Sequence, residues 1–487
     1  MSRTVRRGVM AAVITPLLVS AAVVATPAGA VGRSIATSCA GGVAVVAAPG
    51  AVGAEHGIIR PAVPGAAPSC VVSHVAAESA NGASATSKAY NGGSPPLTRG
   101  DGDTMGGIGA PGAITLTPIF WAPPTTSFPS GFVTGIEALD TNLAAQSGTA
   151  GTVLSELTQY TTASGAHLQN KITAGTPIVD TTTTPASLGV STCSPDQGKI
   201  YNDNAPYSIC ITDAEVGAEV ASQVQAGNLK SDRAHLYAVF TPEGAEVCFG
   251  GANGTLGGSC TPNAQNPSSG FCAYHSSSSN ATTATLYAAM PYSVWDSATQ
   301  IECNGSDQFP QGNAPVDVIA SSYIHEIAEA ITDPVGTAWL DRQGNEIGDL
   351  CSYIYGPTTG TPSALFSQVI GGAAYYVQQL FSNASYTKNR ATGCQSSWTK
   401  PTVSVTATGV MHAKKAISFG AQVSTPSGAV AGRWWSSNGV VLGTGSTLTR
   451  TFTTPGTYTV SLTVTDTGGY STTSSTTVAI ASAVKGK

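Results

Sequence analysis

Charged side chains are scarce in this sequence: they make up 10% of its 487 residues, with 21 lysines and arginines against 27 acidic residues. The formal net charge is −6. A nucleic-acid-binding protein needs a basic surface that neutralises phosphates, so this composition argues against nucleic acid as a partner. Long apolar runs are lacking beyond Ala25, and we therefore expect no transmembrane segment in the mature chain.

The first 30 residues have the order of a secretory signal peptide. Three arginines precede a broken apolar run from Val9 to Ala25, and Ala28-Gly29-Ala30 supplies the small residues of a cleavage site. The run is shorter than the roughly 20 residues that a bilayer span requires. We predict cleavage after Ala30 and a secreted, extracellular protein. Without the three arginines, 18 basic side chains face 27 acidic ones, a net charge near −9.

All ten cysteines follow the predicted signal peptide. An even number of cysteines in an oxidising compartment predicts disulfide bonds, and no spacing among them is typical of a zinc-thiolate site. We expect a local pair between Cys39 and Cys70. The pairing of the other eight stays open.

The composition divides the rest of the chain into three parts. Residues 31–88 are rich in Ala, Gly, Ser and Pro without periodicity, which predicts a leader or pro-segment. Residues 89–398 alternate helix and strand patterns, which predicts an α/β (α+β) main domain. Residues 401–482 contain short alternating strands and turns, which predicts a small β-sandwich.

Local patterns place the elements of the main domain. Apolar periodicity and turn residues predict helices over 132–146, 153–162 and 316–332, with Asn313 a candidate cap for the last. A further helix is expected over 214–226, capped by Asp213. We predict strands over 113–121, 235–240, 284–290 and 374–380, and a disulfide-tied loop over 248–279.

The helix over 316–332 contains the string His325-Glu326-Ile327-Ala328-Glu329. On a helix, His325 and Glu329 lie one turn apart on the same face, and Glu326 lies about 100° round. This is the geometry of the zincin motif H-E-x-x-H, in which two residues bind zinc and the intervening Glu is the general base. Here Glu329 replaces the second histidine. A carboxylate can bind zinc, although it shifts the preference towards harder cations.

A catalytic zinc needs a third protein ligand. Asp349 is our first choice and Glu346 the second, and the one that does not bind zinc could orient His325. Residues 339–344 read as a strand and turn that could return this segment to the helix. His275 is a further candidate, as a ligand or a transition-state donor. The alternative interpretation is a solvated acidic helix face, acids that flank turns, and a structural His275.

Several strings together resemble the EXORDIUM or phosphate-induced-protein family of plant extracellular proteins and its secreted bacterial relatives. The resemblance covers residues 90–398 and implies an extracellular location, an association with the cell wall and a common site, but no assigned activity. The strings are Tyr90-Asn91-Gly92-Gly93, Pro118-Ile119-Phe120-Trp121, Phe271-Cys272-Ala273-Tyr274-His275-Ser276, Leu286-Tyr287-Ala288-Ala289-Met290-Pro291-Tyr292, His325-Glu326-Ile327-Ala328-Glu329-Ala330-Ile331-Thr332-Asp333-Pro334 and Glu346-Ile347-Gly348-Asp349-Leu350-Cys351.

The C-terminal part carries a second resemblance. Residues 455–466, in which Tyr458, Val460, Leu462 and Val464 alternate with hydroxyl residues, are similar to the signature of the polycystic-kidney-disease-type (PKD) domain. This resemblance implies an Ig-like β-sandwich.

The sequence therefore predicts a secreted, zincin-like metallohydrolase that acts on an extracellular protein or peptide. In this hypothesis His325, Glu329 and Asp349 hold Zn²⁺, and Glu326 takes the proton from a water. The alternative is a non-catalytic extracellular or cell-wall-associated protein with a structural or calcium-binding acidic cluster. A glycosidase with paired carboxylates ranks third. Asp333, Asp341, Glu346 and Asp349 are the acids that could hold calcium.

Overall fold

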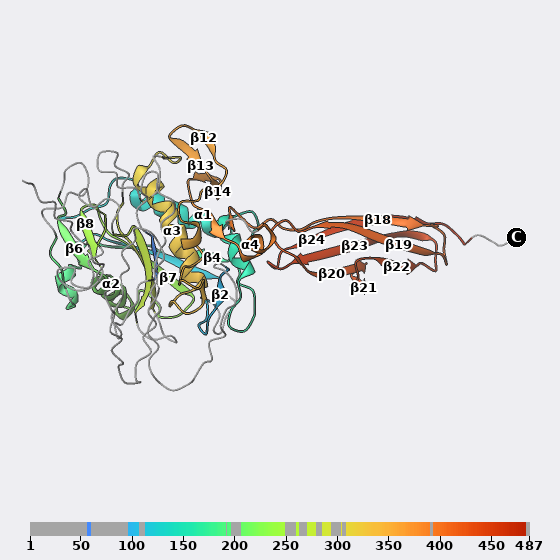
Figure 1. Ribbon diagram of the computed structural model, residues 1–487, viewed down its shortest axis with the longest axis horizontal. Coiled ribbons are helices and arrows are strands. Elements are labelled where there is room, and N and C mark those ends of the chain that lie inside the picture. Colours follow the sequence, from blue (N-terminus) through green and yellow to red (C-terminus); the bar gives the residue numbers. More distant parts are fainter. Residues whose placement is uncertain are drawn as a thin grey trace, which may run out of the picture. The chain divides into compact units, whose positions relative to one another are not determined.

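The computed structural model describes residues 56–59, 96–106, 113–190, 192–195, 206–248, 260–262, 270–278, 285–293, 303, 308–389 and 393–483 (Figure 1). The predicted signal peptide, the Cys39–Cys70 pair and all of the predicted leader except 56–59 lie outside these residues. Within them, no helix combines the length and the hydropathy needed to cross a membrane.

The main domain is built on a mixed sheet of seven described strands. Their order is β1, β9, β10, β7, β3 and β4, and β5 pairs with the other half of β3. Strands β10, β7, β3, β4 and β5 are parallel, whereas β9 pairs antiparallel with both β10 and β1. The bounds are β1 His56–Ile59, β3 Ile114–Trp121, β4 Ile172–Ala174, β5 Ile178–Asp180, β7 His235–Phe240, β9 Ala273–Ser278 and β10 Thr285–Met290.

Helices cover both faces of this sheet, and its central strands β3, β7 and β10 are accordingly buried along almost their whole length. Leu116 and Phe120 of β3 pack in one core with α1 (Phe132–Ala145) and α3 (Ala314–Thr332), which lie side by side (Figure 1). Trp121 packs in a second core with α2 (Asp213–Gln225). The predicted mixture of helices and strands is confirmed.

Helix α3 is the central element of the first core. All its side chains from Val316 to Thr332 are buried, so the alternative of a solvated acidic face is wrong. Asn313 occupies the N-cap position but its side chain does not cap the helix. Instead the Asp317 carboxylate accepts hydrogen bonds from the backbone N–H groups of Gln311 and Asn313 at 3.1–3.2 Å.

Three further local predictions are corrected. The cap of α2 is Thr212, which forms a capping box with Glu215, and not Asp213. Residues 153–159 form a 3₁₀-helix instead of an α-helix. The apolar run over 374–380 is divided between β15 and β16, because tertiary packing and not strand pairing buries its middle.

The predicted loop over 248–279 contains strand β9, whose composition of Ala, Tyr, His and Ser concealed it. Alternation along β9 sends Tyr274 into the core with α2 and Ala273 into the core with α3. His275 is two residues beyond Ala273 and therefore faces α3. The structure thus places His275 on the central sheet.

Four disulfide bonds lie within the described residues. They join Cys193 to Cys210, Cys248 to Cys260, Cys272 to Cys303 and Cys351 to Cys394. The prediction of disulfides is confirmed for these eight cysteines.

The remaining elements of the main domain are short. They are β2 Thr98–Arg99, η1 Val153–Gln159, η2 Pro185–Leu188, β6 Ile209–Thr212, β8 Ala245–Cys248, β11 Trp339–Leu340, η3 Asp349–Cys351, β12 Thr359–Thr361, β13 Ala364–Phe366, β14 Gln368–Ile370, β15 Ala373–Tyr375, β16 Leu380–Phe381, α4 Asn383–Asn389 and β17 Cys394–Gln395.

The C-terminal part is a two-sheet sandwich with its own apolar core. In β23, Val460, Leu462 and Val464 are buried and the residues between them are half-buried, as the alternation predicts. The sheets are β18–β19–β22 and β21–β20–β23–β24, with bounds β18 Thr402–Gly409, β19 Ala416–Ser424, β20 Val430–Ser437, β21 Val440–Gly443, β22 Leu448–Thr451, β23 Gly456–Asp466 and β24 Ser471–Ile480.

Glu156 in η1 generates a prediction about stability and pH. Burial raises its pKa from 4.5 to about 8, although hydrogen bonds from Ser382 and Gln159 oppose the shift. The folded chain therefore keeps a proton that the unfolded chain releases, and stability falls as the pH rises from 4.5 towards 8. We expect Glu156→Gln to remove the part of this fall that Glu156 causes, so that the variant gains stability over the wild type at pH 8 but not at pH 4.5. Urea unfolding at the two pH values measures it.

The control is Glu243→Gln, at an exposed carboxylate. It should leave the pH dependence unchanged. If Glu156→Gln and the wild type lose stability in parallel as the pH rises, the buried carboxyl is not the cause.

Candidate metal centre

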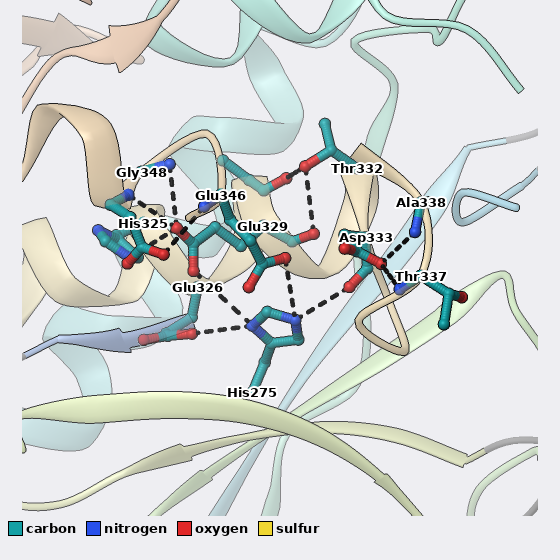
Figure 2. A network of polar contacts seen from close by, with 12 residues as sticks. His275, His325, Glu326, Glu329, Thr332, Asp333, Thr337, Ala338, Glu346 and Gly348 are labelled. Carbon is teal, nitrogen blue, oxygen red and sulfur yellow. Dashed lines mark hydrogen bonds and ion pairs between the residues drawn. The ribbon is translucent and has the colours of Figure 1, made fainter. Parts of the chain in front are cut away.

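Six side chains singled out from the sequence converge between α3, β9 and the segment that follows β11 (Figure 2). They are His275, His325, Glu326, Glu329, Glu346 and Asp349. The exposed fraction is 7% for Asp349 and 0% for the other five. The structure therefore assembles a buried cluster of two imidazoles and four carboxyl groups.

The chain after β11 returns to α3 because of a tight turn. The Asp341 carboxylate accepts hydrogen bonds from the backbone N–H groups of Gln343 and Asn345 at 2.7 and 2.9 Å. Beyond this turn, the N–H groups of Gly348 and Asp349 donate to Glu329 Oε1 at 3.0 and 2.9 Å. These two bonds fix the Glu329 carboxylate against the returning segment.

His325 points its Nε2 atom at two carboxylates. Glu329 Oε1 lies 2.9 Å away and Asp349 Oδ1 lies 3.6 Å away. The 2.9 Å contact is not aligned as a hydrogen bond, and neither nitrogen of His325 has a hydrogen-bond partner. Two ligand atoms on one tetrahedral zinc lie roughly 3.3–3.6 Å apart, given bonds of about 2.0–2.2 Å. The contact of His325 with Asp349 falls within that range, and the contact with Glu329 is shorter than it.

His275 approaches the cluster from the sheet. Its Nδ1 atom lies 3.2 Å from Glu326 Oε2 and 3.9 Å from Glu329 Oε2. Its Nε2 atom lies 3.1 Å from the backbone carbonyl of Asp333 and 3.7 Å from Glu346 Oε1. His275 thus touches three of the four acids, and it is a member of the cluster.

Several buried oxygens of the cluster lack a hydrogen-bond partner. They are Glu326 Oε1, Glu329 Oε2, Asp349 Oδ1 and both oxygens of Glu346. Buried polar groups are nearly always hydrogen-bonded, because an unmade bond costs about 1–3 kcal/mol. Unpaired oxygens and an unpaired imidazole in one place fit a cation better than they fit a structural polar network.

Burial dominates the electrostatics of the carboxyl groups. It raises the pKa of Glu326 and of Glu346 well above the usual value, and the charge of Glu329 adds to both shifts. Burial also raises the pKa of Glu329, with Asp349 adding to it. The cluster therefore disfavours full ionisation unless positive charge lies nearby.

For the imidazole of His325, nearby charges have a larger effect on the pKa than burial has. Burial alone would lower its pKa, but the Glu329 carboxylate, with Asp349, outweighs burial and raises the pKa well above its usual value. His325 is therefore surrounded by groups that attract a positive charge, whether a proton or a metal ion.

The ligand atoms form two overlapping groups. Those of His325, Glu326 and Glu329 lie within 4.8 Å of one another, and so do those of His275, Glu329 and Glu346. The predicted third ligand, Asp349, contacts His325 but belongs to neither group. These donor sets of nitrogen and oxygen suit zinc or a harder divalent cation.

Two further residues shape the centre: Asp333, which the sequence analysis named only as a possible calcium ligand, and Gly348, which it missed. The backbone carbonyl of Asp333 contacts His275, and the Asp333 carboxylate accepts from the N–H groups of Thr337 and Ala338 at 2.7 and 2.8 Å. Gly348 lets the returning segment lie against His325, since a Cβ there would sit 2.6 Å from the imidazole ring. The glycine in the string Ile347-Gly348-Asp349 was the available signal for that close approach.

A family model identifies the C-terminal sandwich. Residues 398–480 match the family described as PKD domain. These residues form a PKD domain. Together with the four disulfides, the PKD domain indicates an extracellular protein. No curated protein matches the chain.

Three solved structures that are similar to the chain each align with less than a fifth of it. The PKD1 domain of the Vibrio cholerae metalloprotease PrtV is 25% identical over 17% of this chain and 99% of its own, with a TM-score of 0.16. The PKD1 domain of Vibrio anguillarum Epp is 23% identical over 18% and 99%, with a TM-score of 0.16. A structure of carbohydrate-binding modules from the β-sandwich superfamily is 29% identical over 18% of this chain, with a TM-score of 0.17, and this chain spans 36% of its length.

The close approach of Gly348 to His325 can be tested with the variant Gly348→Ala. The backbone φ of Gly348 is −82°, which suits alanine, so the variant should be destabilised only because the new methyl group meets the His325 ring. We expect a loss of about 1–3 kcal/mol in the free energy of unfolding, as for an overpacked core. Urea unfolding measures it.

The matched control is Gly217→Ala inside α2. There the nearest atom to the new Cβ is the Tyr287 hydroxyl at 3.4 Å, and alanine should stabilise the helix by about 0.5–1 kcal/mol. Equal stability of Gly348→Ala and the wild type would show that the segment can move away from His325.

Proposed function

We propose that this protein is a secreted metallohydrolase, with peptide bonds as its substrate and with zinc held by His325, Glu329 and Asp349. The observation that carries the proposal is the convergence of two buried carboxylates on the Nε2 atom of His325, which has no hydrogen-bond partner. Without a cation or shared protons, these groups would be an unstable set of buried charges.

The donor set supports zinc. One imidazole and two carboxylates are zinc ligands, and catalytic sites use three protein ligands with a remaining position open to water. Glu329 is already oriented by the N–H groups of Gly348 and Asp349, as ligating carboxylates commonly are. A zinc ion at this place would supply a Lewis acid that lowers the pKa of water and polarises a carbonyl.

Glu326 is the proposed general base. Its side chain belongs to the same group of ligand atoms as His325 and Glu329, and its Oε1 atom has no hydrogen-bond partner. His275 holds the other oxygen, Oε2, at 3.2 Å. His275 is therefore suited to orient Glu326, and it can donate a proton to developing negative charge.

We also propose that the main domain has a zincin-like fold, which is supported by the helix with His325, Glu326 and Glu329. We further propose that residues 90–398 are related to the EXORDIUM family and that the protein is associated with the cell wall. The strings around His275, His325 and Asp349 that suggested this kinship meet in one cluster. Secretion is supported by the disulfides and the PKD domain.

The alternative is a non-catalytic extracellular protein with a structural or calcium-binding cluster, and burial favours it. A peptide must reach a catalytic zinc, yet five of the six cluster side chains have an exposed fraction of 0%. A structural site is closed in this way. Hydrolysis would require the segments around the cluster to open.

The decisive experiment combines metal analysis with hydrolysis of an unfolded protein substrate by the purified mature chain. We expect bound zinc in the wild type and its loss in Glu329→Ala. Glu326→Gln should keep the zinc and lose hydrolysis by roughly 10²–10⁴-fold, because only the proton acceptor is removed.

Glu243→Gln, at an exposed site, should retain both properties. A metal-free native protein would end the proposal. Bound zinc or calcium that raises thermal stability, with no hydrolysis by the wild type, would instead establish the non-catalytic alternative.

A further inference from the structure

The cluster carries more negative charge than one divalent cation neutralises. Among the described residues, the ion pairs at its carboxylates all have histidine as the partner. With both imidazoles neutral and all four carboxyl groups ionised, the cluster has a charge of −4. The four carboxyl groups are those of Glu326, Glu329, Glu346 and Asp349. One zinc ion would leave half of that charge buried without compensation, and two divalent cations would remove it.

Glu329 faces two imidazoles with different oxygens. Its Oε1 atom lies 2.9 Å from His325 Nε2, and its Oε2 atom lies 3.9 Å from His275 Nδ1. The Oε2 atom has no hydrogen-bond partner. A carboxylate placed in this way between two nitrogen donors has the arrangement of a bridging ligand.

Both nitrogens of His275 face acceptor oxygens. The Asp333 carbonyl lies 3.1 Å from Nε2, and the carboxylate oxygens of Glu326 and Glu329 lie 3.2 and 3.9 Å from Nδ1. A neutral ring has one proton for its two nitrogens, so a cation at Nδ1 would leave that proton on Nε2 for the Asp333 carbonyl. Metal-binding histidines are commonly oriented by this kind of hydrogen bond from their other nitrogen to a carbonyl.

Glu346 is an independent sign of a ligand beside the His275 ring. Its exposed fraction is 0%, and neither of its carboxylate oxygens has a hydrogen-bond partner. Figure 2 shows its carboxylate directed towards the His275 ring, where Oε1 lies 3.7 Å from Nε2. The proposed zinc ligands His325, Glu329 and Asp349 leave this carboxylate without a role.

We propose that the cluster holds a second divalent cation, bound by His275, Glu329 and Glu346, and that Glu329 bridges it to the zinc at His325. This inference rests on the proposed function, since it assumes that the cluster is a metal centre. One imidazole nitrogen and several carboxylate oxygens suit Zn²⁺ or Mn²⁺. The centre would then belong to the two-metal hydrolases, whose ions lie about 3.5–4 Å apart.

The test is metal stoichiometry of the full mature chain, loaded by dialysis against Zn²⁺ and, separately, against Mn²⁺. We expect two ions per chain in the wild type and one in Glu346→Gln, which keeps the shape of the side chain and removes its charge. Glu329→Ala should lose both ions. Glu243→Gln is the control, because it removes one exposed carboxylate outside the cluster, and it should keep two.

Electron paramagnetic resonance of the manganese-loaded wild type gives a readout that does not depend on how the variants fold. A carboxylate-bridged pair should give an exchange-coupled spectrum instead of that of isolated Mn²⁺ ions. One ion per chain in the wild type, unchanged by Glu346→Gln, overturns the second site and leaves the proposed function intact. No bound ion overturns both.

Discussion

The burial of helix α3 on every side is the constraint on which the rest of the main domain depends. A helix in this position has no face on which to solvate charge, yet it carries His325, Glu326 and Glu329. The protein must therefore supply the partners of these groups from neighbouring segments. Strand β9 supplies His275, and the segment after β11 supplies two carboxylates and two backbone N–H groups.

The backbone N–H groups and the carboxylates of the segment after β11 have opposite effects on the charge of the cluster. The backbone N–H groups of Gly348 and Asp349 stabilise the Glu329 carboxylate directly, as permanent dipoles. The carboxylates of Glu346 and Asp349 add negative charge to a place that already has too much. Neutral or basic side chains at these positions would have been better partners for the carboxylates of α3. The cation that we propose would neutralise this accumulation of acids.

The parts of the site that lie on one local element could be predicted from the sequence. Helical spacing is enough to bring His325 and Glu329 together, and the turn residues after β11 indicated that Asp349 would return to the helix. The sandwich was also predictable, because strict alternation in β23 repeats a local rule over many residues.

The position of His275 could not be predicted because it depends on pairing between distant strands. β9 is stabilised by antiparallel pairing with β10 and β1, and its own composition resembles a loop. The prediction of one strand over 374–380 was wrong for the converse reason. This apolar run has the composition of a strand, but its residues are buried by packing against the main core, with only short strands at its ends. Register and close approach, as at Gly348, are set by tertiary structure.

Two disulfides fasten the segments that bring ligands to α3. Cys272 precedes His275 by three residues and is joined to Cys303, while Cys351 follows Asp349 by two residues and is joined to Cys394. Both attachments require oxidation. In a reducing compartment the segments with His275 and Asp349 would lose these covalent anchors, and the cluster would be less well ordered around α3. Assembly of the centre is thereby tied to the oxidising side of a membrane, so that acquisition of a metal would follow export and not precede it.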